Sequence, residues 1–112
     1  MYLLETLEFI KKKFFEVEVF GMGFVGFPLA VRLADQGLNV IGIDTSPKRI
    51  ERLQNNSLMD SELRLRDKFV SCRKNGNLIL ANIPKESKIL KIGIICVPTP
   101  IPSESTNSDI FV

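Results

Sequence analysis

Three glycines within six positions constrain the fold of this chain more than any other feature of its sequence. They lie in GMGFVGFPLA, residues 21–30, directly after the short apolar run EVEVF. Apolar residues then recur every four positions from Val25 to Leu33, and Gly37 is a natural end for a helix. The segment therefore predicts a strand over 16–20, a glycine turn and a helix.

The rest of the chain alternates between apolar runs and helical patterns. A first helix is expected over 2–14, because its apolar residues have helical spacing and three lysines fall in its last turn. Ser46 can cap a further helix that has Pro47 at its first position. The other expected elements are strands over 38–44, 77–81 and 92–97, a helix over 59–74 with Leu63, Phe69 and Val70 facing inward, and a short helical or irregular crossover over 84–91. Strands without polar alternation, separated by helices, are typical of a parallel sheet with helices on both faces.

Composition excludes several classes of protein. At 112 residues, 45% of them hydrophobic, the chain can form one small domain with a core, and its net charge of +2 is not gathered into a basic stripe. We therefore expect no nucleic-acid partner. The N-terminus lacks the features of a signal peptide, and no apolar run reaches the roughly 18 residues of a membrane span. We expect a soluble, cytoplasmic protein without a membrane partner.

Metal and disulfide chemistry are also not indicated. Histidine is absent, and the two cysteines, Cys72 and Cys96, lie far apart without CxxC spacing. We expect no metal site, a reducing compartment, and structural roles for both cysteines, because neither has a base or an oxyanion donor near it in the sequence.

The glycine spacing is GxGxxG, which predicts a phosphate-binding turn when a strand precedes it and a helix follows. Gly21 permits the sharp turn, Gly23 lets the backbone approach a pyrophosphate, and Gly26 lets the helix pack closely on the strand. Asp44 ends the next apolar run, 23 positions after Gly21, and can accept hydrogen bonds from ribose hydroxyls. Its charge would repel a 2′-phosphate, which favours NAD over NADP. The alternative is an ordinary glycine turn with a surface aspartate.

Two further features lie near the expected cofactor. Lys48 and Arg49 follow Asp44, and a cation beside the ribose is typical of NADP sites. We interpret Lys48 as helix surface charge and expect Arg49 to reach along the adenosine.

The stretch CVPTP places Thr99 between two prolines at the end of the fourth expected strand. Ligands of a parallel sheet bind at this side, beyond the carboxyl ends of the strands. A rigid strand exit is the alternative.

These motifs together resemble one enzyme family. GMGFVGFPLA, GID with SPKRIERL, and CVPTP, in this order and spacing, are similar to the UDP-glucose/GDP-mannose dehydrogenase family from about residue 16 to the end of the chain. The VPTP form looks most like the branch acting on UDP-N-acetylhexosamines, whose members can carry an extra N-terminal helix. The resemblance implies an N-terminal helix over 1–15 and, over 16–112, an incomplete NAD-binding domain. That domain would be a Rossmann-type doubly wound α/β fold with a truncated parallel sheet in the order 3-2-1-4.

The resemblance also implies an activity. Members of this family use NAD to oxidise the C6 alcohol of a nucleotide sugar twice, to the uronic acid, through a catalytic cysteine. The cofactor-binding positions that carry over are Gly21, Met22, Gly23, Phe24, Val25, Gly26, Asp44, Arg49, Pro98 and Thr99. The family's catalytic residues lie downstream of these motifs, so we expect no catalytic residue here, and a nucleotide-sugar substrate only in a longer chain.

Three residues depart from the family pattern. Glu18 replaces a small apolar residue in the first strand, where an unpaired carboxylate would be costly to bury. Lys91 stands where the family often has an acid, and Phe24 replaces the usual tyrosine. The sheet of the family also continues past the fourth strand, so the outer edge of that strand is expected to be unpaired and to favour self-association. Other hypotheses remain: a β-hydroxy-acid dehydrogenase, a non-catalytic nucleotide-sensing module, or a decayed gene product.

Overall fold

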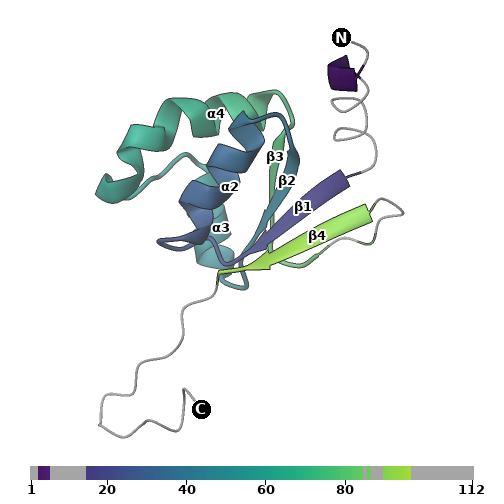
Figure 1. Ribbon diagram of the computed structural model, residues 1–112. Helices are drawn as coiled ribbons and strands as arrows, with labels where there is room; N and C mark the ends of the chain where they lie inside the picture. The colour runs from purple at the N-terminus through teal and green to yellow at the C-terminus, as the bar shows by residue number, and fades with distance from the viewer. Residues whose placement is uncertain (1–2, 6–14, 85, 87–89, 97–112) are drawn as a thin grey trace, which may run out of the picture.

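The structure is a computed structural model that describes residues 3–5, 15–84, 86 and 90–96. Its centre is a single sheet whose strands run parallel in the order β3-β2-β1-β4 (Figure 1). The strands are β1 (Phe15–Phe20), β2 (Asn39–Ile43), β3 (Leu78–Ala81) and β4 (Leu90–Ile95). The predicted order 3-2-1-4 is confirmed, and the carboxyl ends of all four strands meet at one edge of the sheet.

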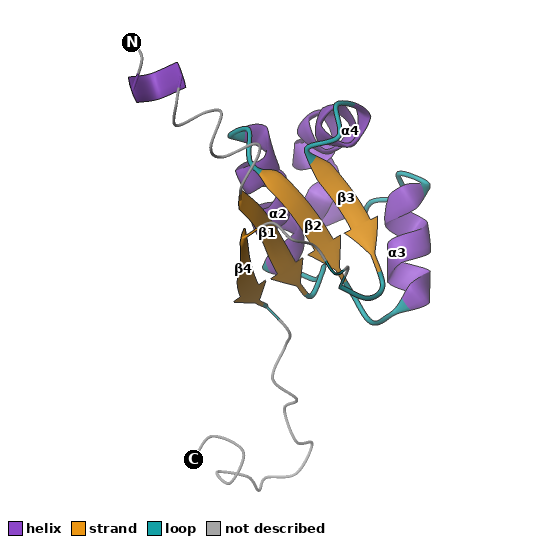
Figure 2. Cartoon of the chain, turned by 90° about the vertical axis from the view of Figure 1, so that its right-hand side faces the viewer, coloured by secondary structure: helices purple, strands orange, loops and turns teal. Residues whose placement is uncertain are grey.

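The helices lie on one side of this sheet, as Figures 1 and 2 both show. They are α2 (Gly26–Asp35), α3 (Pro47–Gln54) and α4 (Arg66–Lys74), with a 3₁₀ helix, η1 (Asp60–Leu65), directly before α4. The helix α3 begins as predicted, because the Ser46 side chain accepts a hydrogen bond from the N–H of Arg49 and Pro47 occupies the first turn. A helix on the opposite face, which a doubly wound sheet has, is not among the described residues.

The expected single helix over 59–74 is wrong, because residues 60–65 form the 3₁₀ helix η1 and the α-helix begins only at Arg66. Side chains three positions apart share a face in this tighter helix. Glu62 and Leu65 are therefore the buried residues of η1, while Leu63 is 48% exposed instead of facing inward. Phe69 is fully buried as expected, and Val70 is half-buried.

The hydrophobic core lies between the sheet and α2. Val17 and Val19 of β1 face α2, and Ala30 and Ala34 of α2 allow it to lie close to the strands. The ring of Phe27 packs against Phe69 of α4, with 5.1 Å between the centroids. This packing fixes the first turn of α2 above the end of β1, which is where the glycine turn lies. Burying such apolar surface supplies most of the stability of a small domain.

Some predicted elements differ in extent or lie outside the described residues. The strand β1 begins at Phe15, and β4 covers 90–95 instead of 92–97. Residues 3–5 are helical, but the remainder of the helix expected over 2–14, part of the 84–91 crossover, and Pro98 and Thr99 lie outside the described residues.

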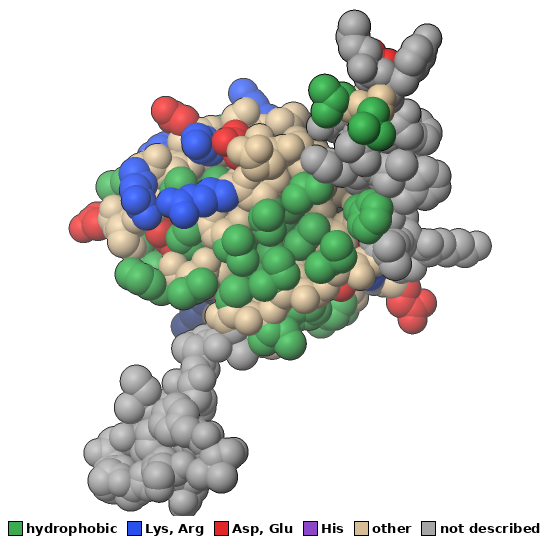
Figure 3. Space-filling view, viewed as in Figure 1, with side chains coloured by type: hydrophobic (Ala, Val, Ile, Leu, Met, Phe, Trp, Pro, Cys, Tyr) green, Lys and Arg blue, Asp and Glu red, His purple; other side chains and the backbone are tan. Residues whose placement is uncertain are grey.

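The strand β4 is one of the two edge strands of the described sheet. Within the described ranges no strand pairs with its outer edge. Ile92 is 47% exposed and Ile95 is 75% exposed. They lie opposite Val17 and Phe20 of β1, and therefore on the two different faces of the sheet. Figure 3 shows hydrophobic side chains gathered on one face of the molecule.

Candidate dinucleotide-binding site

The loop between β1 and α2 begins with a backbone conformation that only glycine adopts easily. Gly21 has φ of 101°, in the left-handed region. Its N–H donates to the carbonyl oxygen of Ile43 at 2.6 Å, which joins the end of β1 to the end of β2. The chain can therefore leave the sheet sharply, as the turn role predicted for Gly21 requires.

The other two glycines of the motif have different surroundings. A Cβ at Gly26 would lie 1.6 Å from the carbonyl oxygen of Gly21, so this position has no room for a side chain. A Cβ at Gly23 would have no atom within 4 Å. Gly26 is therefore needed for the packing of the loop itself, whereas the space above Gly23 is open to a ligand.

The start of α2 offers hydrogen-bond donors beside this open space. The first N–H groups of a helix have no partners within the helix. Among the described residues we find no acceptor for the N–H groups of Phe24 and Val25. Donors at a helix N-terminus bind anionic groups such as phosphates. The loop and the first turn of α2 thus have the form of a phosphate cradle.

Met22 anchors the loop to the sheet. Its side chain is fully buried, and a Cβ at Gly42 would lie 2.6 Å from its sulfur atom, so the glycine in β2 makes room for it. Its N–H donates to Oδ2 of Asp44 at 2.8 Å, and its carbonyl oxygen accepts from Nε of Arg49 at 2.7 Å. Both backbone groups of Met22 are thus engaged within the protein.

Asp44 lies at the carboxyl end of β2, beside the cradle. Besides Met22, it accepts a hydrogen bond at Oδ1 from the N–H of Ser46 at 2.9 Å. A carboxylate has about four acceptor sites, so two hydrogen bonds leave capacity for ligand hydroxyls. The side chain of Asn82, a residue that we did not predict, donates to the carbonyl oxygen of Asp44 at 3.1 Å. The carboxylate is therefore held in place while it can still accept from a ribose.

Arg49 lies beside the cradle, as predicted, but its guanidinium has partners within the protein. In addition to Met22, it contacts the Glu62 carboxylate through Nη2. Its Cζ atom lies 5.6 Å from the centroid of the Phe27 ring, a cation–π distance. The predicted reach along the adenosine remains a prediction.

Glu62 is a second site residue that the sequence analysis did not predict. Its side chain is 3% exposed, and its Oε1 accepts the N–H of Met59 at 3.0 Å, which fixes the start of η1. The signal for this contact was an acid three positions after Met59, the spacing of a helix-capping glutamate. Its pairing with Arg49, by contrast, depends on tertiary structure.

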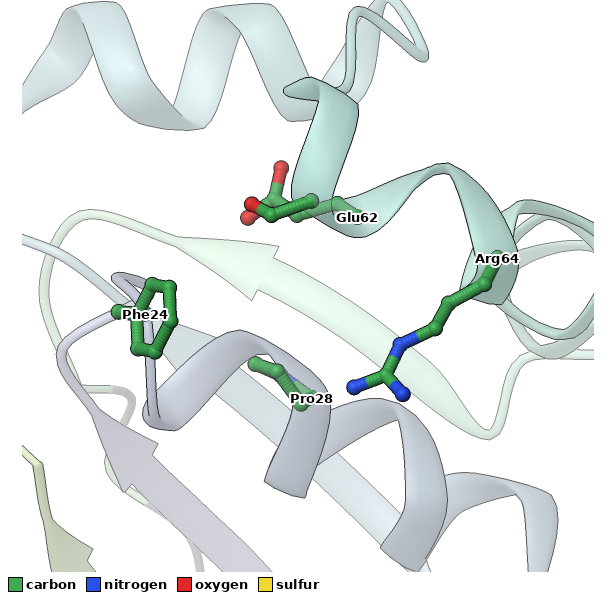
Figure 4. Close-up of a pocket in the computed structure, with 5 residues that line it drawn as sticks. Phe24, Pro28, Glu62 and Arg64 are labelled. Atoms are coloured by element: carbon green, nitrogen blue, oxygen red, sulfur yellow. The ribbon is translucent and has the colours of Figure 1, made fainter.

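A small pocket opens between the cradle and η1. It has a volume of about 140 Å³ and is lined by Phe24, Pro28, Ser61, Glu62 and Arg64. Figure 4 shows Phe24 and Pro28 on one side of it and Glu62 and Arg64 on the other. Pockets that hold whole small molecules are typically about 300–1,000 Å³, so this one can hold only part of a dinucleotide. Phe24, 80% exposed, presents its ring to solvent at the edge of the cradle.

The surroundings of Cys72 disfavour its thiolate form. Cys72 is buried, and this burial, together with the nearby charge of Asp35, raises the pKa of its thiol, although Lys68 lowers it. Cys96 is half-buried and follows β4, where its N–H donates to the carbonyl oxygen of Phe20. In the described part of the chain, no group of three or more Cys, Asp or Glu could hold a metal ion, and no helix is long and apolar enough to cross a bilayer.

The chain is similar in sequence to a known protein family. The family model "UDP-glucose/GDP-mannose dehydrogenase family, NAD binding domain" matches residues 15–111. The UDP-N-acetyl-D-mannosamine dehydrogenase of Methanococcus aeolicus is 34% identical over 90 residues, which are 80% of this chain and 20% of that enzyme. The enzyme of the same name from Methanocaldococcus jannaschii is 37% identical over 82 residues, 73% of this chain and 18% of that protein. The chain thus spans about a fifth of the length of these relatives.

Solved structures agree with the sequence matches. A UDP-N-acetyl-mannosamine dehydrogenase from Staphylococcus aureus superimposes with a TM-score of 0.69 at 29% identity, over 80% of this chain and 21% of that chain. A ternary complex of GDP-mannose dehydrogenase from Pseudomonas aeruginosa gives a TM-score of 0.64 at 26% identity, over 78% of this chain and 20% of that chain. These matches disfavour the β-hydroxy-acid dehydrogenases that the glycine motif alone left open.

Proposed function

The chain belongs to the UDP-glucose/GDP-mannose dehydrogenase family, whose NAD-binding domain matches its residues 15–111, and we propose that it supplies the NAD site of a nucleotide-sugar 6-dehydrogenase. The reaction proposed for the longer enzyme is the oxidation of the C6 alcohol of the sugar to a uronic acid. Because the relatives it matches are UDP-N-acetyl-D-mannosamine dehydrogenases, we propose a UDP-N-acetylhexosamine as the substrate. The chain by itself is proposed to bind NAD without turnover.

The observation that carries this proposal is the pairing of an open cradle with a fixed carboxylate. The space above Gly23 is empty, and the N–H of Met22, the loop residue before Gly23, donates a 2.8 Å hydrogen bond to the Asp44 carboxylate. A dinucleotide needs these two features close together, because its pyrophosphate lies against the glycine loop and its ribose against the acid. The residues present therefore fit NAD.

Each group of the chain has a distinct part in this binding. The N–H groups of Phe24 and Val25 would donate to the pyrophosphate, and the dipole of α2 would stabilise its charge. The Asp44 carboxylate would accept from the adenosine ribose hydroxyls. Bound NAD supplies the acceptor for a hydride from the carbon that is oxidised. Pro98 and Thr99, at the end of the fourth predicted strand, are proposed to contact the cofactor as in the family.

Calorimetry with the 112-residue chain tests this function. We expect NAD to bind, and we expect no NADH absorbance when UDP-N-acetyl-D-mannosamine and NAD are added together. Circular dichroism on the same sample shows whether the protein is folded. A folded chain that binds no NAD would overturn the cofactor assignment, and turnover by this chain would overturn the proposal that it is inactive alone. NAD binding that changes the oligomeric state would favour a nucleotide-sensing module.

A further inference from the structure

Arg49 and Asp44 meet at a single residue of the glycine loop. The N–H of Met22 donates to Asp44, and the carbonyl oxygen of the same residue accepts from Nε of Arg49. A guanidinium therefore lies beside the carboxylate that is placed to bind the ribose. An arginine in such a position accommodates the 2′-phosphate in NADP-binding proteins. Without a partner, Arg49 would therefore favour NADP, whereas the domain of this family binds NAD.

Glu62 changes the charge that this arginine presents. Its Oε2 contacts Nη2 of Arg49, and the two side chains are 3% and 14% exposed. The other oxygen of the carboxylate accepts the N–H of Met59 at 3.0 Å. The carboxylate is therefore fixed from two sides, and little water is present to screen its interaction with Arg49. Asp44, Arg49 and Glu62 together carry a formal charge of −1.

We propose that Glu62 is a specificity-determining residue, which holds and neutralises Arg49 so that the ribose pocket accepts NAD and rejects NADP. This inference rests on the proposed NAD site and adds a residue from η1, a separate element, to it. Glu62 acts through Arg49 and is thus a positioning residue. With its carboxylate in place, a 2′-phosphate meets the net negative charge of the three side chains. Without that carboxylate, the charge of Arg49 becomes available to the 2′-phosphate.

A purely structural role for Glu62 makes a different prediction. If the carboxylate only fixed the start of η1, its loss would weaken the binding of NAD and NADP by the same factor. The ratio of the two dissociation constants therefore separates the two roles. Glu62→Gln is the suitable variant, because the amide keeps the size of the side chain and an oxygen that can accept the N–H of Met59.

The experiment measures Kd for NAD and for NADP by calorimetry on the full chain and its variants. We expect Glu62→Gln to shift the ratio toward NADP by at least about threefold, since unpaired charge contributes mainly to the discrimination between ligands. The double variant Arg49→Gln with Glu62→Gln should have the same ratio of Kd values for NAD and NADP as Arg49→Gln alone. Glu51→Gln, at an exposed position of α3, alters the net charge equally and should not move the ratio.

The outcomes separate this inference from the proposed function. If the folded wild-type chain binds neither dinucleotide, the NAD site itself is wrong. If the wild type binds NAD but Glu62→Gln leaves the ratio unchanged, or shifts it no more than Glu51→Gln does, then the role of Glu62 is overturned. If Glu62→Gln does not fold, Glu62→Asp replaces it, because the shorter side chain weakens the contact with Arg49. It should shift the ratio in the same direction, and an unchanged ratio would also overturn the inference.

Discussion

Glu18 of β1 and Lys91 of β4 form an ion pair within the sheet, with 3.2 Å between Nζ and Oε2. Lys91 lies opposite Glu16 in the strand register, so its side chain reaches along the sheet to Glu18. The Glu18 side chain is 8% exposed and that of Lys91 is 23% exposed. A buried carboxylate without a partner is costly. Two of the three residues that depart from the family pattern are thus partners of each other.

Removing one member of this pair should destabilise the protein. We expect Lys91→Met to lower the free energy of unfolding by about 3 kcal/mol, because it leaves the Glu18 carboxylate buried without this cation. The double variant Glu18→Val with Lys91→Met should recover most of the loss, since apolar residues often replace a buried ion pair at little cost. Urea denaturation followed by circular dichroism measures both changes.

Lys74→Met is the control for this experiment, because Lys74 lies at an exposed position of α4. It removes the same charge and should change the unfolding free energy by less than about 0.5 kcal/mol. Equal effects of Lys74→Met and Lys91→Met would show that the ion pair contributes nothing to stability.

The two glycines of the cradle should respond differently to the same substitution. Gly26→Ala should destabilise the fold by at least about 3 kcal/mol, because the new Cβ would overlap the backbone of Gly21. Gly23→Ala should leave the stability nearly unchanged, since the space there is open. It should weaken NAD binding by roughly tenfold, about 1.4 kcal/mol, because the methyl group occupies the path of the pyrophosphate. Thermal melts and calorimetry on both variants test this contrast, and a Gly23→Ala chain with normal NAD affinity would contradict it.

Asp44 should contribute both to the affinity for NAD and to the stability of the glycine loop. We expect Asp44→Asn to weaken NAD binding by about tenfold, or 1.4 kcal/mol, because an amide has only one acceptor oxygen. One of the N–H groups of Met22 and Ser46 then loses its partner, so the melting temperature should fall as well. Asp67→Asn, on the exposed side of α4, is the matched control. Unchanged NAD affinity in Asp44→Asn would remove Asp44 from the site.

Cys72 should make the stability depend on alkaline pH. Its thiol has a raised pKa in the folded state, chiefly because it is buried. The folded protein therefore holds the proton more tightly than the unfolded chain does, and stability falls as the pH rises above about 8.5. Urea denaturation across this range should show the fall in the wild type and in Cys96→Ala, which keeps Cys72. The fall should be smaller in Cys72→Ala, and equal slopes in all three proteins would contradict the assignment.

Local signals predicted most of the fold. Strand and helix order follow from short apolar runs and from the glycine, serine and proline residues that begin or end each helix. The break between η1 and α4 did not follow, because the burial of Leu65 in the core in place of Leu63 depends on tertiary packing and not on a local signal. The Glu18 and Lys91 contact depends on the register of two strands distant in sequence, which no local pattern specifies.

The candidate site was predictable to a similar extent. The positions of Gly21, Gly26 and Asp44 relative to one another follow from the spacing of one motif. The contact between Arg49 and Glu62 joins α3 to η1 between residues 13 positions apart. Neither hydrophobic periodicity nor helix propensity could identify this contact from the sequence. The parts of the site that one sequence motif specifies were therefore predicted, and the part that depends on tertiary packing was not.

The place of β1 in the middle of the sheet has a consequence for the order in which the chain folds. Its neighbour β2 follows closely, but Glu18 and its partner in β4 are separated by 73 positions. Contacts over such distances form late, because closing a long loop costs entropy. We therefore expect Lys91→Met to speed unfolding while leaving the refolding rate nearly unchanged in stopped-flow measurements. Until β4 pairs with β1, the carboxylate of Glu18 can stay hydrated, and only a correctly aligned β4 brings the cation that allows it to be buried.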